Sequence, residues 1–488
     1  MDMSVQKRFF SGSLALLAVG LGVICCMVFA DTGLAAVPPT GLNCVASDGK
    51  INGRGATFQE RAQQTVFAPA YRDDFCGNVA EQFAGDPAGN TMVAYNYPSA
   101  KSASATGSGA GIKAASCRTD AYSGTDIPYT VASLKELDEA AGKTGGCGIA
   151  FEPPFQPKPG PWPEAKDTTA NVMSFPVAGS AVSLMTNLTE KNCGAGVLPP
   201  TSLNLNAKEV SRLLGGDVAN WNDPELVTTN PGGSGVGLEK CAGAVTRVVR
   251  QDTSGTTNIF KQYLIRAENE RTGGTRTCAT GKKWEAYFTT NTEWPGKQGA
   301  EGTCSAITTA AKSGNGELIT KLKETEGGVG YADLNEAVGS GLLLPNVTNS
   351  TGASFQPPNI GKGANCSFSG LSLPGLSASD SVGLNAEDNW SNNNETNPGA
   401  PANHENATNL GAKYPICGIT FMLVYSGLDN GAVLDPNNRL TADQRRTLYS
   451  YSTFILSSTA QDLLSTSNYS ALPSAWLPKL RAGFQENF

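Results

Sequence analysis

Short apolar runs alternate with amphipathic stretches along the chain from residue 51 onward. The runs are rich in β-branched and aromatic residues and end near Gly, Pro, Asn or Asp, which is typical of strands. The long run at 172–188 predicts a pair of buried strands. The runs fall at residues 51–58, 92–100, 120–129, 172–188, 243–250, 327–334 and 414–426.

The stretches between these runs carry helical periodicity. Thr441 stands where a helix N-cap is expected, ahead of one long amphipathic helix. Alternating strands and helices indicate an α/β fold with mixed or parallel sheets. The expected helices cover residues 59–75, 107–115, 206–215, 258–265 and 441–464.

Two stretches interrupt the alternation. Residues 145–170 are rich in Pro and Gly, and residues 355–412 are rich in Asn, Gly, Ser and Pro. Both compositions are typical of long surface loops or partly disordered inserts.

Charge narrows the range of partners. Among 488 residues only 16% are charged, and the net charge is −7 with no basic block. This argues against nucleic acid or an anionic membrane surface as the main partner.

The N-terminus has the pattern of an export signal. Lys7 and Arg8 precede an apolar run at 14–30, and small residues follow it. We expect residues 1–36 to be a signal peptide, either cleaved or retained as an anchor. The chain is then exported to the periplasm or the cell surface.

Cysteine usage agrees with export. Of the 12 cysteines, Cys25 and Cys26 lie inside the signal, and an even number remains. The rest form no C-x-x-C pair, and His404 is the single histidine, so no metal site or cofactor is expected. Disulfides are the better prediction. The simplest pairing, which sequence alone does not fix, is Cys44–Cys76, Cys117–Cys147, Cys193–Cys241, Cys278–Cys304 and Cys366–Cys417.

The stretch "VVRQDTSGTT" at 248–257 places Arg250 just before a run of hydroxyls and glycine. It has the pattern of a strand that turns into a helix N-terminus, where unsatisfied N–H groups favour an anion. Ordinary helix capping by Ser or Thr is the alternative. Asp252 is expected to pair with Arg250 or to cap the helix.

Two further Gly-rich turns follow strands, "GATF" at 55–58 and "GSGAG" at 107–111. With these turns, the chain resembles the phosphate-binding proteins of bacterial ABC transporters. The resemblance spans roughly 51–430, and the order of the motifs agrees with it. The matching motifs are "GRGATF" (53–58), "YNYPSAKSASATGSGAGIK" (95–113), "YSGTDIPY" (122–129), "ANWNDPEL" (219–226), "VVRQDTSGTTNIFKQYL" (248–264), "GGVGYADL" (327–334) and "YPICGITFMLVY" (414–425).

The resemblance implies a set of phosphate ligands. They come from the turns after four strands and consist of backbone amides, hydroxyls, one carboxylate and one guanidinium. The positions that match are Thr57, Phe58, Ser108, Asp126, Arg250, Ser254, Gly255 and Thr256. The longer link before Ser108 departs from the family pattern, as do the cysteines and the large insert.

Asp126 carries the argument for selectivity. An ionised carboxylate only accepts hydrogen bonds, so it opposes fully deprotonated sulfate, whereas phosphate keeps a proton that it can donate. A turn-capping role for Asp126 is the alternative.

The resemblance also implies a two-lobed periplasmic-binding-protein-like fold, with a mixed sheet flanked by helices in each lobe and the ligand in the cleft. One lobe is expected to hold residues 37–180 with 415–488, and the other residues 181–345. The crossings between lobes lie near 174–186 and 414–425, and residues 346–414 form a loop-like insert.

The expected function is that of a monomeric, non-enzymatic receptor that delivers inorganic phosphate to a membrane permease by hinge closure. One alternative is a surface-displayed adhesion protein on the same fold. Another is a secreted phosphatase or serine hydrolase, against which stand the lone His404 and the lack of a G-x-S-x-G elbow.

Overall fold

The computed structural model describes residues 50–76, 93–96, 107–117, 119–126, 172–232, 237–269, 294, 310–368, 411–425 and 440–488. Its centre is one eight-stranded mixed sheet with the order β2-β1-β3-β13-β4-β8-β6-β7. The expected α/β fold is therefore confirmed. The strands of this sheet are β1 (Ile51–Gly55), β2 (Val93–Tyr95), β3 (Tyr122–Thr125), β4 (Val172–Asn187), β6 (Thr246–Arg250), β7 (Ala310–Lys312), β8 (Gly328–Asp333) and β13 (Cys417–Tyr425).

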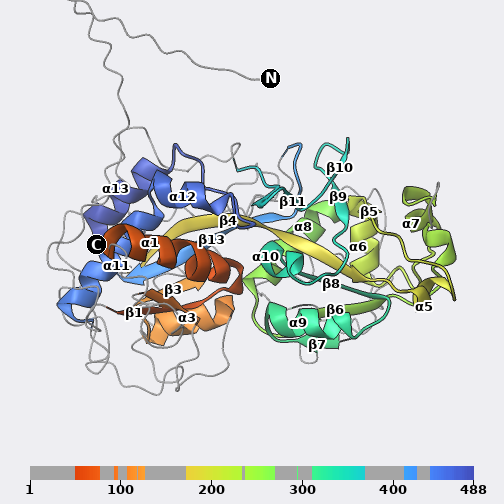
Figure 1. Ribbon diagram of the computed structural model, residues 1–488, viewed down its shortest axis with the longest axis horizontal. Helices are drawn as coiled ribbons and strands as arrows, with labels where there is room; N and C mark the ends of the chain where they lie inside the picture. Colours follow the sequence, from red (N-terminus) through yellow and green to blue (C-terminus); the bar gives the residue numbers. More distant parts are fainter. Residues whose placement is uncertain are drawn as a thin grey trace, which may run out of the picture.

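The sheet has two halves, each with its own helices, and we call them lobe 1 and lobe 2 (Figure 1). Lobe 1 contains the parallel strands β1, β2 and β3, with β13 antiparallel to β3. Lobe 2 contains the parallel strands β6, β7 and β8. The carboxyl ends of the parallel strands meet where the lobes join.

Strand β4 connects the lobes. Residues 172–181 of β4 pair with β13, whereas residues 182–187 pair with β8. The predicted pair of strands at 172–188 is thus wrong, because one continuous strand serves both lobes. Its buried residues explain the pattern: a strand covered on both faces shows no polar alternation. The placement of a hinge here stays a prediction.

Helices cover both faces of the sheet. In lobe 1 a 3-10 turn η2 (Thr57–Gln59) and a π-helix η3 (Ala62–Phe67) lead into α1. The α-helices are α1 (Ala68–Cys76), α3 (Ser108–Cys117), α5 (Glu190–Cys193), α6 (Ala207–Gly215), α7 (Pro224–Thr229), α8 (Gly255–Asn269), α9 (Gly314–Lys323), α10 (Leu334–Val338), α11 (Ala442–Ile455), α12 (Ser458–Leu464) and α13 (Leu477–Asn487); a 3-10 turn η4 (Leu238–Lys240) lies before β6.

The helix predicted at 441–464 is two helices, α11 and α12. Thr441 caps α11 as expected, and its hydroxyl accepts from the N–H of Gln444. Ser457 then starts α12 by accepting from the N–H of Ala460. A second N-cap inside an amphipathic run interrupts the backbone hydrogen bonding without disturbing the apolar periodicity.

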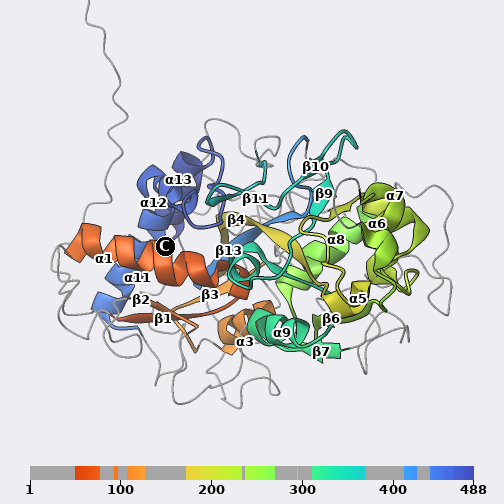
Figure 2. The same cartoon turned by 45° about the vertical axis from the view of Figure 1, so that its right-hand side comes forward.

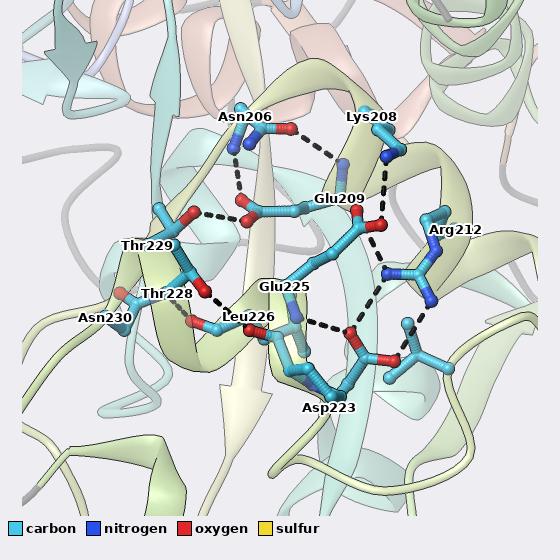
Figure 3. A network of polar contacts seen from close by, with 12 residues as sticks. Asn206, Lys208, Glu209, Arg212, Asp223, Glu225, Leu226, Thr228, Thr229 and Asn230 are labelled. Atoms are coloured by element: carbon cyan, nitrogen blue, oxygen red, sulfur yellow. Dashed lines mark hydrogen bonds and ion pairs between the residues drawn. The ribbon is translucent and has the colours of Figure 1, made fainter.

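A polar network joins α6 to α7 in lobe 2 (Figure 3). Asn206 and Glu209 form a capping box at the start of α6. Arg212 makes two parallel hydrogen bonds, each 3.0 Å long, to the carboxylate of Asp223, which caps α7. This network fixes the two helices on the side of lobe 2 away from lobe 1.

The described part of the predicted insert, residues 346–368 and 411–414, contains short strands. A three-stranded sheet joins β5 (Asn204–Leu205), β9 (Asn346–Thr348) and β10 (Phe355–Gln356). A two-stranded sheet joins β11 (Asn359–Ile360) and β12 (Gly363–Ala364). The segment 145–170 lies outside the described residues.

Two of the expected disulfides are confirmed, Cys193–Cys241 and Cys366–Cys417. For the other three pairs, at least one cysteine of each lies outside the described residues. Within the described ranges, no helix combines the length and apolar character needed to span a bilayer. The predicted signal at 1–36 lies outside those ranges.

Candidate functional site

The site lies where the strand ends of the two lobes face each other. Figure 2 shows α3 of lobe 1 and α9 of lobe 2 at this junction. The N–H of Gly109 at the start of α3 donates to the carbonyl of Thr253 in lobe 2, at 3.2 Å. Ligand sites in α/β proteins occur at the carboxyl ends of strands in this way.

Arg250 ends β6, and its side chain is fully buried. Its Nε donates to Asp252 at 2.7 Å, and its Nη2 donates to the second oxygen of the same carboxylate. Its Nη1 donates to the amide oxygen of Asn315 at 2.7 Å. The expected pairing of Asp252 with Arg250 is therefore confirmed. The Arg250 guanidinium in turn holds the pKa of Asp252 below its usual range, against the opposing effect of burial.

The hydroxyl run forms the beginning of α8. Ser254 is buried, and its hydroxyl oxygen accepts from the N–H of Thr257 at 3.1 Å, which leaves its proton to donate. The first amides of α8, at Gly255 and Thr256, have no acceptor within the helix. Thr256 is buried, and among the described residues its hydroxyl has no hydrogen-bond partner. This turn therefore both caps the helix and holds hydrogen-bond donors without a partner among the described residues.

Gly255 is packed against lobe 1. A Cβ added there would lie 2.3 Å from the Ser108 hydroxyl and 2.5 Å from the Asp126 Cβ. Only glycine allows this approach of the α8 backbone to the two lobe 1 side chains. The close packing brings three predicted site residues together from different lobes.

Asp126 is buried directly after β3. Its carboxylate accepts from the hydroxyl of Thr420 at 2.7 Å and from that of Ser108 at 3.2 Å. Burial raises the pKa of Asp126 to about 7, although these two hydrogen bonds and the charge of Arg250 act in the opposite direction. The Ser108 oxygen also accepts from the N–H of Asp126 at 3.1 Å, so Asp126 both fixes a turn and places a carboxylate in the site.

Thr57 and Phe58 begin the turn after β1. The Thr57 hydroxyl oxygen accepts from the amide nitrogen of Asn315 at 3.2 Å, across the junction. Phe58 is buried, and its carbonyl accepts from the hydroxyl of Tyr469 at 2.9 Å. The side chain of Phe58 therefore belongs to the core.

Sequence reasoning missed three residues of this site. Asn315 follows β7 in "SGNGE", a fourth Gly-rich turn between a strand and a helix, so the same signal could have found it. Thr420 lies inside the apolar strand β13, and Gln59 donates to its hydroxyl at 2.8 Å. No local pattern marks either of these two.

The predicted residues thus meet at one junction, where Gly255 packs against Ser108 and Asp126 and Asn315 links Arg250 to Thr57. They offer hydroxyls, backbone amides, one guanidinium and the Asp126 carboxylate, while the carboxylates of Asp252 and Asp333 accept from Arg250 and Asn315. Hydroxyls, backbone amides and guanidinium groups are the donors that bind small oxyanions in proteins. Within the described residues, no group of His, Cys, Asp and Glu is arranged to hold a metal ion.

A two-lobed protein with anion donors at the strand ends of both lobes has the architecture of a periplasmic-type binding protein. The family model for the PBP superfamily domain matches residues 72–435. The chain belongs to this superfamily.

The most similar relatives include proteins named for phosphate. A phosphate-binding protein PstS of Xylella fastidiosa is 25% identical over 190 residues, which are 39% of this chain and 43% of that protein. Phosphate-binding protein PstS 3 of Mycobacterium tuberculosis is 22% identical over 323 residues, which are 66% of this chain and 70% of that protein. The first match thus spans less than half of the relative.

Solved structures share the fold. A high-affinity periplasmic phosphate-binding protein bound with phosphate superimposes with a TM-score of 0.51 at 16% identity, covering 89% of this chain and 93% of the other. A phosphate-binding protein from Stenotrophomonas maltophilia gives the same TM-score of 0.51 at 16% identity and the same coverage, 89% and 93%. At such identities the likeness establishes the fold, and the expected two-lobed architecture is confirmed.

Proposed function

We propose that this chain is an extracytoplasmic receptor for inorganic phosphate, which it binds between its lobes without chemical turnover. The observation that carries the proposal is the buried carboxylate of Asp126 among hydrogen-bond donors from both lobes. Relatives named phosphate-binding proteins support it.

Each part of the ligand has a partner in this proposal. Thr57, Ser254, Thr256 and the first amides of α8 donate to the oxygens. Arg250 adds charge-assisted donors, because three of its five N–H groups are used inside lobe 2 and two remain. Ser108 and Phe58 contribute backbone N–H groups at the starts of α3 and η2.

Asp126 supplies selectivity. When it is ionised, it accepts the proton of bound phosphate. Sulfate has no proton at neutral pH, so the two groups of lone pairs would face each other without a hydrogen bond. An unpaired buried charge costs several kcal/mol, which excludes sulfate.

The family resemblance extends the proposal to transport. Closure of the lobes around phosphate would create the surface that a membrane permease of an ABC transporter recognises. The predicted export signal at 1–36 would place the chain outside the cytoplasm, where such a receptor works.

Calorimetry of the mature chain with phosphate, arsenate and sulfate tests the proposal. At pH 8 and fixed salt we expect phosphate and arsenate to bind and sulfate to bind at least roughly 100-fold more weakly, the factor that about 3 kcal/mol corresponds to. Asp126→Asn supplies an amide donor of the same size. We expect it to reduce the difference between the phosphate and sulfate affinities, mainly by raising the affinity for sulfate. Equal affinity of the wild type for sulfate and phosphate would refute the phosphate assignment.

A further inference from the structure

Asn315 lies at the point where donors from both lobes meet, and its side chain is buried. It is the second residue of α9, whose first N–H, that of Gly314, donates to the Asp252 carboxylate at 3.0 Å. The carboxylate that holds Arg250 therefore also anchors the helix that carries Asn315. The position of the amide is fixed by the same ion pair that fixes the guanidinium.

The orientation of the Asn315 amide follows from chemistry. Arg250 has no acceptor, so the atom 2.7 Å from its Nη1 must be the amide oxygen. The amide nitrogen then faces the Asp333 carboxylate and the Thr57 hydroxyl oxygen. Its two N–H groups match these two acceptors, so each polar atom of the Asn315 side chain has a partner.

This orientation determines what the Thr57 hydroxyl does. A hydroxyl has one proton, and an oxygen that accepts from Asn315 directs its own proton elsewhere. Thr57 is the first residue of η2, just after β1, and its hydroxyl lies at the junction of the lobes. Its proton is then available to a ligand held between the lobes.

We propose that Asn315 is a positioning residue that directs two anion donors, Arg250 of lobe 2 and Thr57 of lobe 1, toward the ligand. This inference rests on the proposed phosphate-binding function. Because the bond to Thr57 crosses the junction, the same amide also couples orientation of the donors to closure of the lobes.

Asn315→Asp tests the inference with almost no change in size. A carboxylate at this position still holds Arg250, but it also accepts the proton of the Thr57 hydroxyl and removes that donor from the anion. It loses the hydrogen bond to the Asp333 carboxylate as well, and this second effect is the same with and without the Thr57 hydroxyl. The new charge repels the anion as well. We therefore measure phosphate affinity for Asn315→Asp in two backgrounds, wild type and Thr57→Val, because only the first contains the hydroxyl.

Asn187→Asp is the matched control. Asn187 donates to the carbonyls of Leu322, Lys323 and Thr325 at the other end of α9, at 3.0, 2.9 and 3.1 Å. It supports the same helix without reaching the site. Thermal unfolding of each variant separates a loss of stability from a loss of affinity.

The expected result is at least a tenfold loss of phosphate affinity for Asn315→Asp, and a loss at least threefold smaller in the Thr57→Val background. Asn187→Asp should lower thermal stability and keep phosphate affinity within twofold of wild type. If Asn315→Asp does not fold, phosphate affinity is measured instead for Asn315→Ala, in the wild-type and Thr57→Val backgrounds. The expected losses of affinity are the same.

Equal losses in the two backgrounds would show that Asn315 does not act through Thr57, and an equal loss in Asn187→Asp would show a general effect of α9. Either outcome overturns the inference while leaving phosphate binding by the wild type intact. Absence of phosphate binding by the wild type would instead overturn the proposed function, and the role of Asn315 with it.

Discussion

Arg250 is a buried cation whose charge is neutralised before any ligand arrives. The carboxylate of Asp252 takes two of its N–H groups, and Asn315 takes a third. The pair with Asp252 keeps the buried guanidinium from being an uncompensated charge. What remains for an anion is a pair of fixed donors rather than a net positive charge.

We expect Arg250→Ala to lower phosphate affinity at least tenfold, because a hydrogen bond to a charged group contributes about 1.5–3 kcal/mol. Calorimetry at fixed salt measures the loss. Arg212→Ala is the control, since Arg212 makes a comparable pair with Asp223 in the network between α6 and α7 (Figure 3).

Arg212→Ala should change phosphate affinity less than twofold. A phosphate dissociation constant that stays at the wild-type value in Arg250→Ala would remove Arg250 from the site. The same loss in both variants would point to stability rather than to binding.

At the scale of elements, the site is built from the turns that follow parallel strands. The register of β6 and β7 pairs Arg250 with Lys312, so the loops after these strands lie side by side and bring Asn315 to Arg250. On the other side, β13 carries Thr420 to Asp126 from a distant part of the sequence. The positions of the site residues therefore depend on the pairing of the strands that carry them.

The two described disulfides brace different elements. Cys366–Cys417 fastens the segment after β12 to the first residue of β13, whereas Cys193–Cys241 links α5 to the segment before β6. Their sequence separations, 51 and 48 residues, are nearly equal. In the chain-entropy model each bridge then stabilises the fold by a similar amount, about 4 kcal/mol.

We therefore expect the paired replacements Cys366→Ala with Cys417→Ala, and Cys193→Ala with Cys241→Ala, to lower the free energy of unfolding by similar amounts. Urea unfolding of the oxidised proteins provides the measurement, and a thiol titration of unfolded, unreduced wild type provides the control. Unchanged urea midpoints in both variants would contradict a stabilising role for these bridges.

At the scale of the whole molecule, the contact between the lobes buries carboxyl groups. Burial raises the pKa of Asp126 to about 7 and that of Asp333 well above its usual range. Between the unfolded and folded pKa values the native state binds more protons than the unfolded state. These groups therefore favour folding most at acid pH, and their contribution is lost as pH rises through the folded pKa.

Without phosphate, we expect the free energy of unfolding to fall between pH 5 and pH 8. The depressed pKa values of Asp223 and Asp252 do not alter this slope, because both groups are ionised throughout the window in the folded and unfolded states. Urea unfolding at several pH values measures the slope.

Asp126→Asn isolates the contribution of one group. In this variant the free energy of unfolding should fall less steeply with pH than in the wild type, by at most about 1.4 kcal/mol per pH unit. Identical slopes in the two proteins would mean that Asp126 titrates in the fold as it does in the unfolded chain.

The sequence by itself determined much of this protein, since the alternation of runs predicted the α/β fold and the Gly-rich turns with Arg250 indicated residues that lie together where the lobes meet. That these residues bind an anion stays a prediction. Such signals are local: a turn that needs glycine, or a helix that needs a cap, shows it within a few residues. The order of the cysteines along the chain also suggested the two described disulfides, as the simplest pairing.

Only the tertiary structure decided that β4 is one strand shared by two lobes, and that Thr420 lies beside Asp126. Thr420 lies 294 residues from Asp126 along the chain, so no local pattern could relate them. The structure also showed that the pKa values of Asp126 and Asp252 shift in opposite directions. Burial raises the pKa of Asp126, whereas the guanidinium of Arg250 lowers that of Asp252, and both effects depend on neighbours that only folding brings together.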